Sequence, residues 1–194
     1  MLTLLASARR GLSERELQEL VAGLAAADDL FPVLRQLRPY LLSRAGLIDF
    51  YHLSLARAVG ECYLGSPTKK GVMHARLAEY FRDKPDWQRA ARSGDARRAN
   101  ARKADELPWQ LLQAEQWDGL RQCLTDIGFL EAKCAAGMTY ALLEDFAAGV
   151  QDQRGTMTIL LLVLAATALQ VQPKEKAPFT VPAAKNDLVK QIND

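Results

Sequence analysis

The chain has 194 residues, of which 49% are apolar and 25% are charged, and its formal net charge is +2. This length suffices for one domain and part of a second, and the composition is ordinary for a globular protein. The small net charge argues against a protein that binds nucleic acid by neutralising its phosphates. Three cysteines without a C-x-x-C pair, and only two histidines, favour neither disulfides nor a zinc site; they favour a reducing, cytoplasmic setting.

Two apolar stretches bear on targeting and membrane association. The first ten residues, MLTLLASARR, place their basic pair after the apolar run, which is the wrong order for a signal peptide. Residues 157–171 form an apolar run that is shorter than the roughly twenty residues needed to span a bilayer. We interpret this run as a buried helix, with a membrane segment as the less favoured alternative, and predict no membrane association.

Residues 2–43 have helical patterns. A short helix is predicted over residues 2–9. The capping-box pattern S-x-x-E of Ser13 and Glu16 predicts that a second helix begins there. Residues 30–43 are predicted as a third helix, which Pro39 should kink or split because proline has no N–H to donate.

A short strand and a fourth helix follow the turn at Ala45-Gly46. Residues 47–51 have the composition of a strand, and the apolar spacing from Leu53 to Tyr63 predicts a helix. His52 lies at the junction, where a helix N-terminus offers free N–H groups and a positive dipole end to an anion such as phosphate. His52 is therefore the one candidate binding residue. The alternative, that it only caps the helix or packs at the strand end, stays open.

These elements are the parts of a winged-helix-like domain, which we predict over residues 1–82. Its third helix carries Arg35 and Arg38, but no aromatic or amide side chains that could read base edges are interleaved with them. We therefore favour a solvated face over a DNA-binding one and regard nucleic acid as an unlikely partner. His74, in a helix predicted from residue 72 onwards, is expected to be structural.

The remaining chain divides into three parts. Residues 83–104 are rich in arginine and lysine and are predicted as a basic linker or an exposed helix. Residues 105–171 show short paired helices, typical of an α-solenoid-like helical arm. Residues 172–194, with prolines among lysines, are predicted as a flexible tail. The predicted fold class is thus mainly α, a winged-helix-like domain followed by an α-solenoid-like array.

No motif for catalysis occurs. The sequence has no G-x-x-x-x-G-K-[ST], G-x-G-x-x-G, H-E-x-x-H or G-x-S-x-G pattern. His52 and Cys62 would lie about 15 Å apart along one helix, too far for a nucleophile and its base. We predict neither a catalytic residue nor a metal site, and hence no enzyme activity.

Four stretches together resemble one family. They are ARRGLSERELQEL (8–20), the segment 34–64, HARLAEYF (74–81) and the segment 106–137. In this order they resemble the region after the ATPase core of NACHT-type STAND proteins, especially those similar to telomerase-associated protein and nephrocystin with WD or TPR repeats. The resemblance implies a winged-helix domain followed by a helical superstructure. It also implies two kinds of partner: the nucleotide-binding domain of the same or a partner chain, and other proteins that bind the helical arm.

The family's winged-helix domain carries an F-x-H motif whose histidine reaches the β-phosphate of bound ADP. Phe50-Tyr51-His52 matches this motif, so the resemblance implies that His52 contacts ADP once an ATPase core is present. The chain departs from the family in lacking Walker motifs, in having Glu115 at a turn where relatives tend to have glycine, and in a tail without a repeat signature. No cofactor is therefore expected in this chain alone, and ADP or ATP only in the parent protein.

The leading hypothesis is a non-catalytic regulatory and scaffold part of a STAND signalling ATPase, which couples nucleotide state to partner binding. The alternatives are a free-standing winged-helix DNA-binding regulator and a TPR-like protein-interaction adaptor. Response to nucleotide, salt-dependent DNA binding, or binding to proteins alone would distinguish the three.

Overall fold

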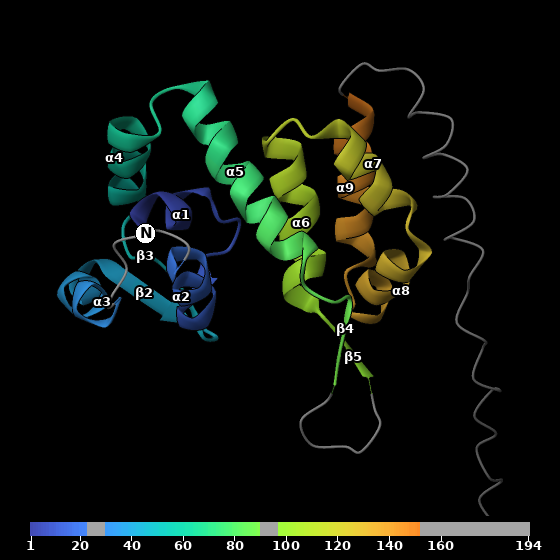
Figure 1. The fold of residues 1–194 in the computed structure, drawn as a ribbon, viewed down its shortest axis with the longest axis horizontal. Helices are drawn as coiled ribbons and strands as arrows, with labels where there is room; N and C mark the ends of the chain where they lie inside the picture. The colour runs from blue at the N-terminus through green and yellow to red at the C-terminus, as the bar shows by residue number, and fades with distance from the viewer. Residues whose placement is uncertain (23–29, 90–96, 152–194) are drawn as a thin grey trace, which may run out of the picture.

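The computed structural model describes residues 1–22, 30–89 and 97–151, and helices dominate this part of the chain (Figure 1). The N-terminal half contains α1 (Leu2–Ser7), β1 (Leu12–Ser13), α2 (Glu14–Ala22), α3 (Phe31–Leu37), the 3-10 helix η1 (Arg38–Tyr40), β2 (Leu41–Arg44), β3 (Leu47–Phe50) and α4 (Leu53–Tyr63). Then follow α5 (Pro67–Arg82), β4 (Trp87–Arg89), β5 (Arg97–Ala99), α6 (Ala101–Gln113), α7 (Trp117–Thr125), α8 (Ile127–Ala135) and α9 (Thr139–Gln151). The predicted mainly α class is confirmed. The winged-helix assignment stays a prediction.

A small antiparallel sheet lies in the N-terminal half, with strand order β1-β3-β2. Ala45 and Gly46 both have positive φ angles, 51° and 78°, which is typical of the two-residue turn that closes a tight hairpin. This turn pairs Arg44 with Leu47 and so sets the register of β2 against β3. The predicted turn is present, and the strand predicted over residues 47–51 is present as β3, which ends at Phe50.

The segment predicted as one helix over residues 30–43 differs in the structure. The helix α3 ends at Leu37, and β2 occupies residues 41–44. Pro39 lies in the 3-10 turn between them, and its missing N–H explains why the α-helix does not continue. The sequence LLSR of β2 lacks the β-branched residues that favour strands, so its strand character comes from the hairpin itself.

The capping box predicted near the N-terminus is confirmed by two hydrogen bonds. The N–H of Ser13 donates to Glu16 Oε2 at 2.7 Å, and the N–H of Glu16 donates to Ser13 Oγ at 3.2 Å, which is a complete capping box. Gly11 precedes it with a φ of 78°, and a Cβ atom there would lie 2.3 Å from the carbonyl oxygen of Ile48. Only glycine allows β1 to approach β3 this closely.

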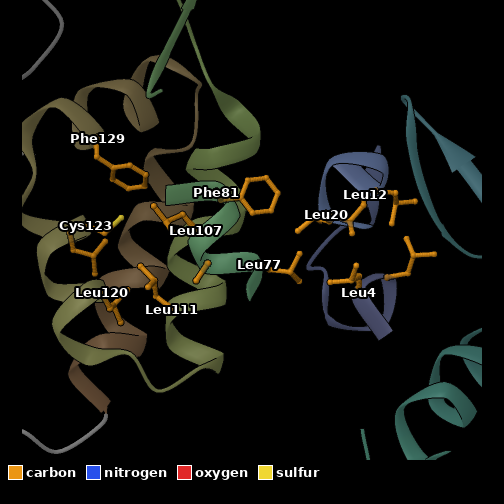
Figure 2. Packing of buried hydrophobic residues seen from close by; sticks show 14 of the residues in the cluster. Leu4, Leu12, Leu20, Leu77, Phe81, Leu107, Leu111, Leu120, Cys123 and Phe129 are labelled. Carbon is orange, nitrogen blue, oxygen red and sulfur yellow. The ribbon is translucent and has the colours of Figure 1, made fainter. Parts of the chain in front are cut away.

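The helix α5 joins the two halves of the molecule through one hydrophobic core. Figure 2 shows Leu77 and Phe81 of α5 between two groups of apolar side chains, and both residues are almost fully buried. One group belongs to the N-terminal half and includes Leu4, Leu12 and Leu20; the other belongs to the helical arm and includes Leu107, Leu111, Leu120, Cys123 and Phe129. The core is therefore continuous from α1 to α9.

The helical arm consists of α6 to α9, packed around α6 (Figure 1). Glu115 (φ 54°) ends α6 and Gly137 (φ 77°) ends α8, so both turns use the left-handed conformation that commonly terminates helices. Glu115 thus occupies a backbone position that usually favours glycine. Pro108 lies inside α6 and leaves one carbonyl without its helical donor.

The interval 83–104, predicted as a basic linker or an exposed helix, contains a two-stranded ribbon of β4 and β5 and the first turn of α6. The ribbon projects from the helical body (Figure 1). Asn100 holds its base, because its N–H donates to Asp86 O at 2.8 Å and its Nδ2 donates to Pro85 O at 3.0 Å.

Within the described ranges, no helix is both long and apolar enough to cross a membrane. The apolar run of residues 157–171 and the predicted tail of residues 172–194 lie outside the described residues.

Candidate functional site

His52, the residue singled out from the sequence, is the N-cap residue of α4. Its backbone is extended (φ −116°, ψ 130°), and its carbonyl accepts the first helical hydrogen bonds, from Leu55 at 3.0 Å and Ala56 at 3.3 Å. The imidazole is exposed and makes no capping hydrogen bond. It contacts the ring of Tyr51 edge-on, with centroids 4.5 Å apart. The predicted helix start is thus present, and the ring is accessible beside it.

A network of buried polar side chains lies elsewhere, where the turn after α1 meets α6. Glu106 is at its centre and is fully buried. Its two carboxylate oxygens accept hydrogen bonds from the backbone N–H groups of Arg9 at 3.1 Å and Arg10 at 3.2 Å. Gln110 Nε2 donates to the same carboxylate at 2.8 Å. Glu106 therefore accepts hydrogen bonds from two successive backbone N–H groups of the turn that follows α1.

Arg102 connects this network to the capping box. Its guanidinium donates to both carboxylate oxygens of Glu16, at 3.0 and 3.2 Å, and to Glu106 Oε1 at 3.3 Å. It also donates to the carbonyl of Gly11 at 3.0 Å. The planar fork of arginine suits such simultaneous contacts. One side chain of α6 thereby fixes the start of α2 and the turn before β1.

Asp105 of α6 adds ion pairs to the contact between α6 and the turn after α1. Arg9 Nη1 lies 3.1 Å from Asp105 Oδ1, and Arg10 Nε lies 2.9 Å from Asp105 Oδ2. Both oxygens of this buried carboxylate are therefore paired. Arg9 also approaches α9, where its Nη1 lies 4.0 Å from Asp145 Oδ1.

His74 joins the network from α5. Its Nδ1 lies 2.7 Å from Gln110 Oε1, and because Gln110 Nε2 donates to Ser7 O and Glu106, the amide oxygen is the acceptor and His74 the donor. Burial lowers the pKa of His74, against the smaller opposing effect of the Gln110 hydrogen bond. The structural role predicted for His74 agrees with this geometry.

A second buried contact holds the arm together. Lys133 of α8 is fully buried, and its Nζ donates to Ala104 O at 2.6 Å and to Asp145 Oδ2 of α9. Its ammonium group thus bridges three helices. Buried ion pairs are costly to break, since removing one partner leaves an uncompensated charge.

Glu19 forms an exposed cluster on α2 beside a cavity of about 500 Å³. It accepts hydrogen bonds from Lys84 at 2.6 Å, Arg15 at 2.8 Å and Tyr80 at 2.7 Å. These hydrogen bonds, chiefly that from Lys84, lower the pKa of Glu19 to about 2. The cluster lies near the solvent, so its contribution to stability is modest.

Several exposed apolar side chains mark the outer surfaces. On α9, Tyr140 is 84% exposed and Leu143 is 41% exposed, and their spacing places them on one face of the helix. Where α4 ends and α5 begins, Tyr63 and Val72 line an apolar hollow of about 290 Å³. These surfaces offer contact area to a partner.

The described residues contain no group of three or more His, Cys, Asp or Glu side chains that could hold a metal ion. Cys123 is buried, which raises the pKa of its thiol, whereas Cys62 and Cys134 are exposed.

The structure does not bring His52 into the network of His74 and Glu106. His52 and this network are separate features.

Sequence reasoning missed the buried network. The sequence predicts Arg102 in a basic linker or exposed helix, and Asp105 and Glu106 at the start of the arm, whereas the structure buries both carboxylates. The spacing of the charged residues at 102, 105 and 106, with Gln110 one turn further, was the available signal, because it places them on one helix face.

Part of the chain is similar to a known protein. No family model matches the chain, and no solved structure matches it. The chain is similar to a TPR repeat-containing protein of Dictyostelium discoideum, with 34% identity over 88 residues. The match covers 45% of this chain and 5% of the length of that protein. This similarity and the mainly helical structure fit a TPR-like helical region.

Proposed function

We propose that this chain is a non-catalytic protein-interaction module within a larger protein, and that it binds protein partners through its helical arm. The observation that carries the proposal is the 34% identity to a TPR repeat-containing protein. TPR-type repeats stack helices so that each buries a face against its neighbours, and the outer surface stays available to partners. The packing of α6 to α9 around one core is consistent with such stacking.

The exposed face of α9 is the part of the arm best suited to a partner. Tyr140 and Leu143 present apolar surface on one face of the helix. Aromatic side chains are enriched in protein interfaces because they bury large area with few rotatable bonds. The buried Lys133 and Asp145 hold α8 and α9 together, so this face is presented by a rigid unit.

Site-specific photo-cross-linking tests the proposal. A photo-reactive amino acid replaces Tyr140 in the parent protein. As a control, the same amino acid replaces Gln18, which is exposed on α2 and far from Tyr140 in the sequence. We expect position 140 to cross-link reproducibly to one protein, and position 18 not to. Tyr140→Asp combined with Leu143→Asp should abolish co-purification of that protein. Equal labelling from both positions, or none from position 140, would count against an interaction through the arm.

The second candidate is a regulatory role after the ATPase core of a STAND protein. Two features support it. His52, preceded by Phe50 and Tyr51, is exposed at the start of α4. The order helix, strand, helix, helix, strand, strand, with sheet order β1-β3-β2, is typical of winged helices. In this role His52 contacts the β-phosphate of ADP held by the nucleotide-binding domain and favours the closed state.

The test of this second role uses the parent protein. His52→Ala should raise basal activation and lower the amount of ADP that co-purifies, and Tyr51→Phe serves as a control that keeps the neighbouring ring. Unchanged basal activity together with unchanged ADP retention would remove His52 from the mechanism.

A further inference from the structure

The β4–β5 ribbon carries arginines that pair with no acidic side chain in the described part of the chain. In its register, Trp87 lies opposite Ala99, Gln88 opposite Arg98, and Arg89 opposite Arg97. Directly opposed residues share one face of a two-stranded ribbon, and residues two apart share it as well. Trp87, Arg89 and Arg97 therefore lie on one face, and Arg98 lies on the other.

Arg89 and Arg97 lie directly opposite each other in the ribbon. Neither forms an ion pair with any residue in the described ranges, and both are exposed. Like charges directly opposite in a ribbon repel and destabilise it. Outside the ribbon, the described cations of the same basic interval are paired: Lys84 with Glu19, Arg102 with Glu16 and Glu106, and Lys103 with Asp86. The unpaired charge is therefore concentrated on the ribbon.

The surface between these side chains is hollowed. Trp87, Arg89 and Arg97 line a cavity of about 320 Å³, and Gln88, which the register places with Arg98 on the other face, also contributes to its lining. Trp87 is only partly buried and lines this hollow together with the two exposed arginines. Tryptophan and arginine are the residues most enriched where binding energy concentrates in protein interfaces.

We propose that this face of the ribbon binds an acidic segment of a protein partner, with carboxylates seated between Arg89 and Arg97 and an apolar side chain against Trp87. Guanidinium groups bind carboxylates through two parallel hydrogen bonds, and one carboxylate between two arginines would offset their repulsion. The inference rests on the proposed interaction function and names the chemistry of one partner site.

The dimensions and charges favour a short acidic peptide over a nucleic acid. Each strand has three residues and spans roughly 10 Å, which accommodates only a few residues of an extended chain. The cavity on the other side, which Arg98 lines, is also lined by Glu16 and Glu19. Arg15, Lys84 and Arg102 also line this cavity, and they are already paired with these two carboxylates. A continuous row of free cations, which a phosphate backbone would need, therefore does not extend from the ribbon into this cavity.

Fluorescence anisotropy on the full chain tests the proposal with three probes: a fluorescein-labelled glutamate-rich peptide with one central leucine, the same peptide with glutamine at every glutamate, and a uridine oligonucleotide of equal net charge. We expect the glutamate peptide to bind most tightly, and more weakly as salt rises. Arg89→Glu with Arg97→Glu should weaken binding by about tenfold or more, as expected for loss of charged hydrogen bonds. Lysine at both positions should weaken it less.

Arg35→Glu with Arg38→Glu is the matched control, because these arginines are exposed on a remote element. It should leave binding within about twofold. Circular dichroism checks that each variant is folded. Absent binding of the glutamate peptide at low salt, equal binding of the glutamine peptide, or an unchanged affinity of the Arg89/Arg97 variant would overturn the proposal. Tighter binding of the oligonucleotide would assign the ribbon to nucleic acid instead. If one of these results is found while position 140 still cross-links to a partner, the ribbon site is rejected and the proposed interaction through the arm is not.

Discussion

The ammonium group of Lys133 lies 2.6 Å from the carbonyl oxygen of Ala104, the one carbonyl of α6 that Pro108 leaves without a donor. In a regular helix the N–H of residue 108 would bond this oxygen. Proline has no N–H, so a side chain from another helix takes its place. The packing of α8 against α6 and the position of the proline are therefore linked.

Replacing Lys133 should be among the most destabilising changes in the arm. Lys133→Met removes the donor to Ala104 and leaves Asp145 buried without its closest cation, which costs about 3–5 kcal/mol for a buried pair. Urea denaturation followed by circular dichroism measures the change. In the double variant with Asp145→Leu, the loss should be smaller than the sum of the single losses, because the buried charge is gone. Additive losses would mean that the two side chains are not coupled.

Gly11 and Gly46 form a matched pair for a second prediction. Both have a φ of 78°, but a Cβ atom at Gly11 would meet Ile48 O at 2.3 Å, whereas at Gly46 it would meet nothing within 4 Å. Gly46→Ala should therefore cost only the left-handed conformation, about 1–2 kcal/mol. Gly11→Ala should cost clearly more, because the backbone of β3 has to move. Equal shifts in the unfolding midpoint of the two variants would contradict the close approach of β1 and β3.

His74 should make stability depend on pH. Burial lowers its pKa in the folded state below the ordinary value of 6.5, so the unfolded chain binds the proton more readily. The free energy of unfolding should therefore fall as the pH falls below 6.5 and through the lowered pKa. His74→Gln cannot titrate and should flatten this dependence, as measured by urea titrations between pH 5 and 7.5. A dependence that persists in the variant would have another origin.

DNA binding distinguishes the winged-helix regulator from the protein-interaction adaptor. Arg35 and Arg38 are exposed on α3 and η1. They line a cavity of about 580 Å³ together with the apolar Leu34 and Leu41, which is not a surface that tracks a phosphate backbone. We expect no gel shift of duplex DNA at low salt. A salt-dependent shift that Arg35→Ala and Arg38→Ala abolish would favour the regulator over the adaptor.

Local features of the fold could be predicted from the sequence. The capping box of Ser13 and Glu16, the turn at Ala45-Gly46 and the helix start at His52 each depend on a few neighbouring residues. Turn and cap chemistry act over three or four residues, so a single sequence contains them.

Features that depend on distant residues could not be predicted. The β4–β5 ribbon contains mainly arginine, glutamine and alanine, which have little strand preference, and it is held at its base by Asn100. Charged residues normally indicate an exposed face, yet Glu106 and Lys133 are fully buried because their partners come from other elements. Whether His52 contacts a nucleotide depends on a domain outside this chain, so this role stays a prediction.

The central claim is that protein partners bind the arm. Its most direct test uses the partner protein that cross-links at position 140, after purification. Calorimetry measures the affinity of this partner for three forms of the chain: the wild type, the double variant Tyr140→Asp with Leu143→Asp, and His52→Ala. The account predicts one binding site, a loss of at least about tenfold in affinity for the arm variant, and no change for the His52 variant. An arm variant that binds as tightly as the wild type would contradict it.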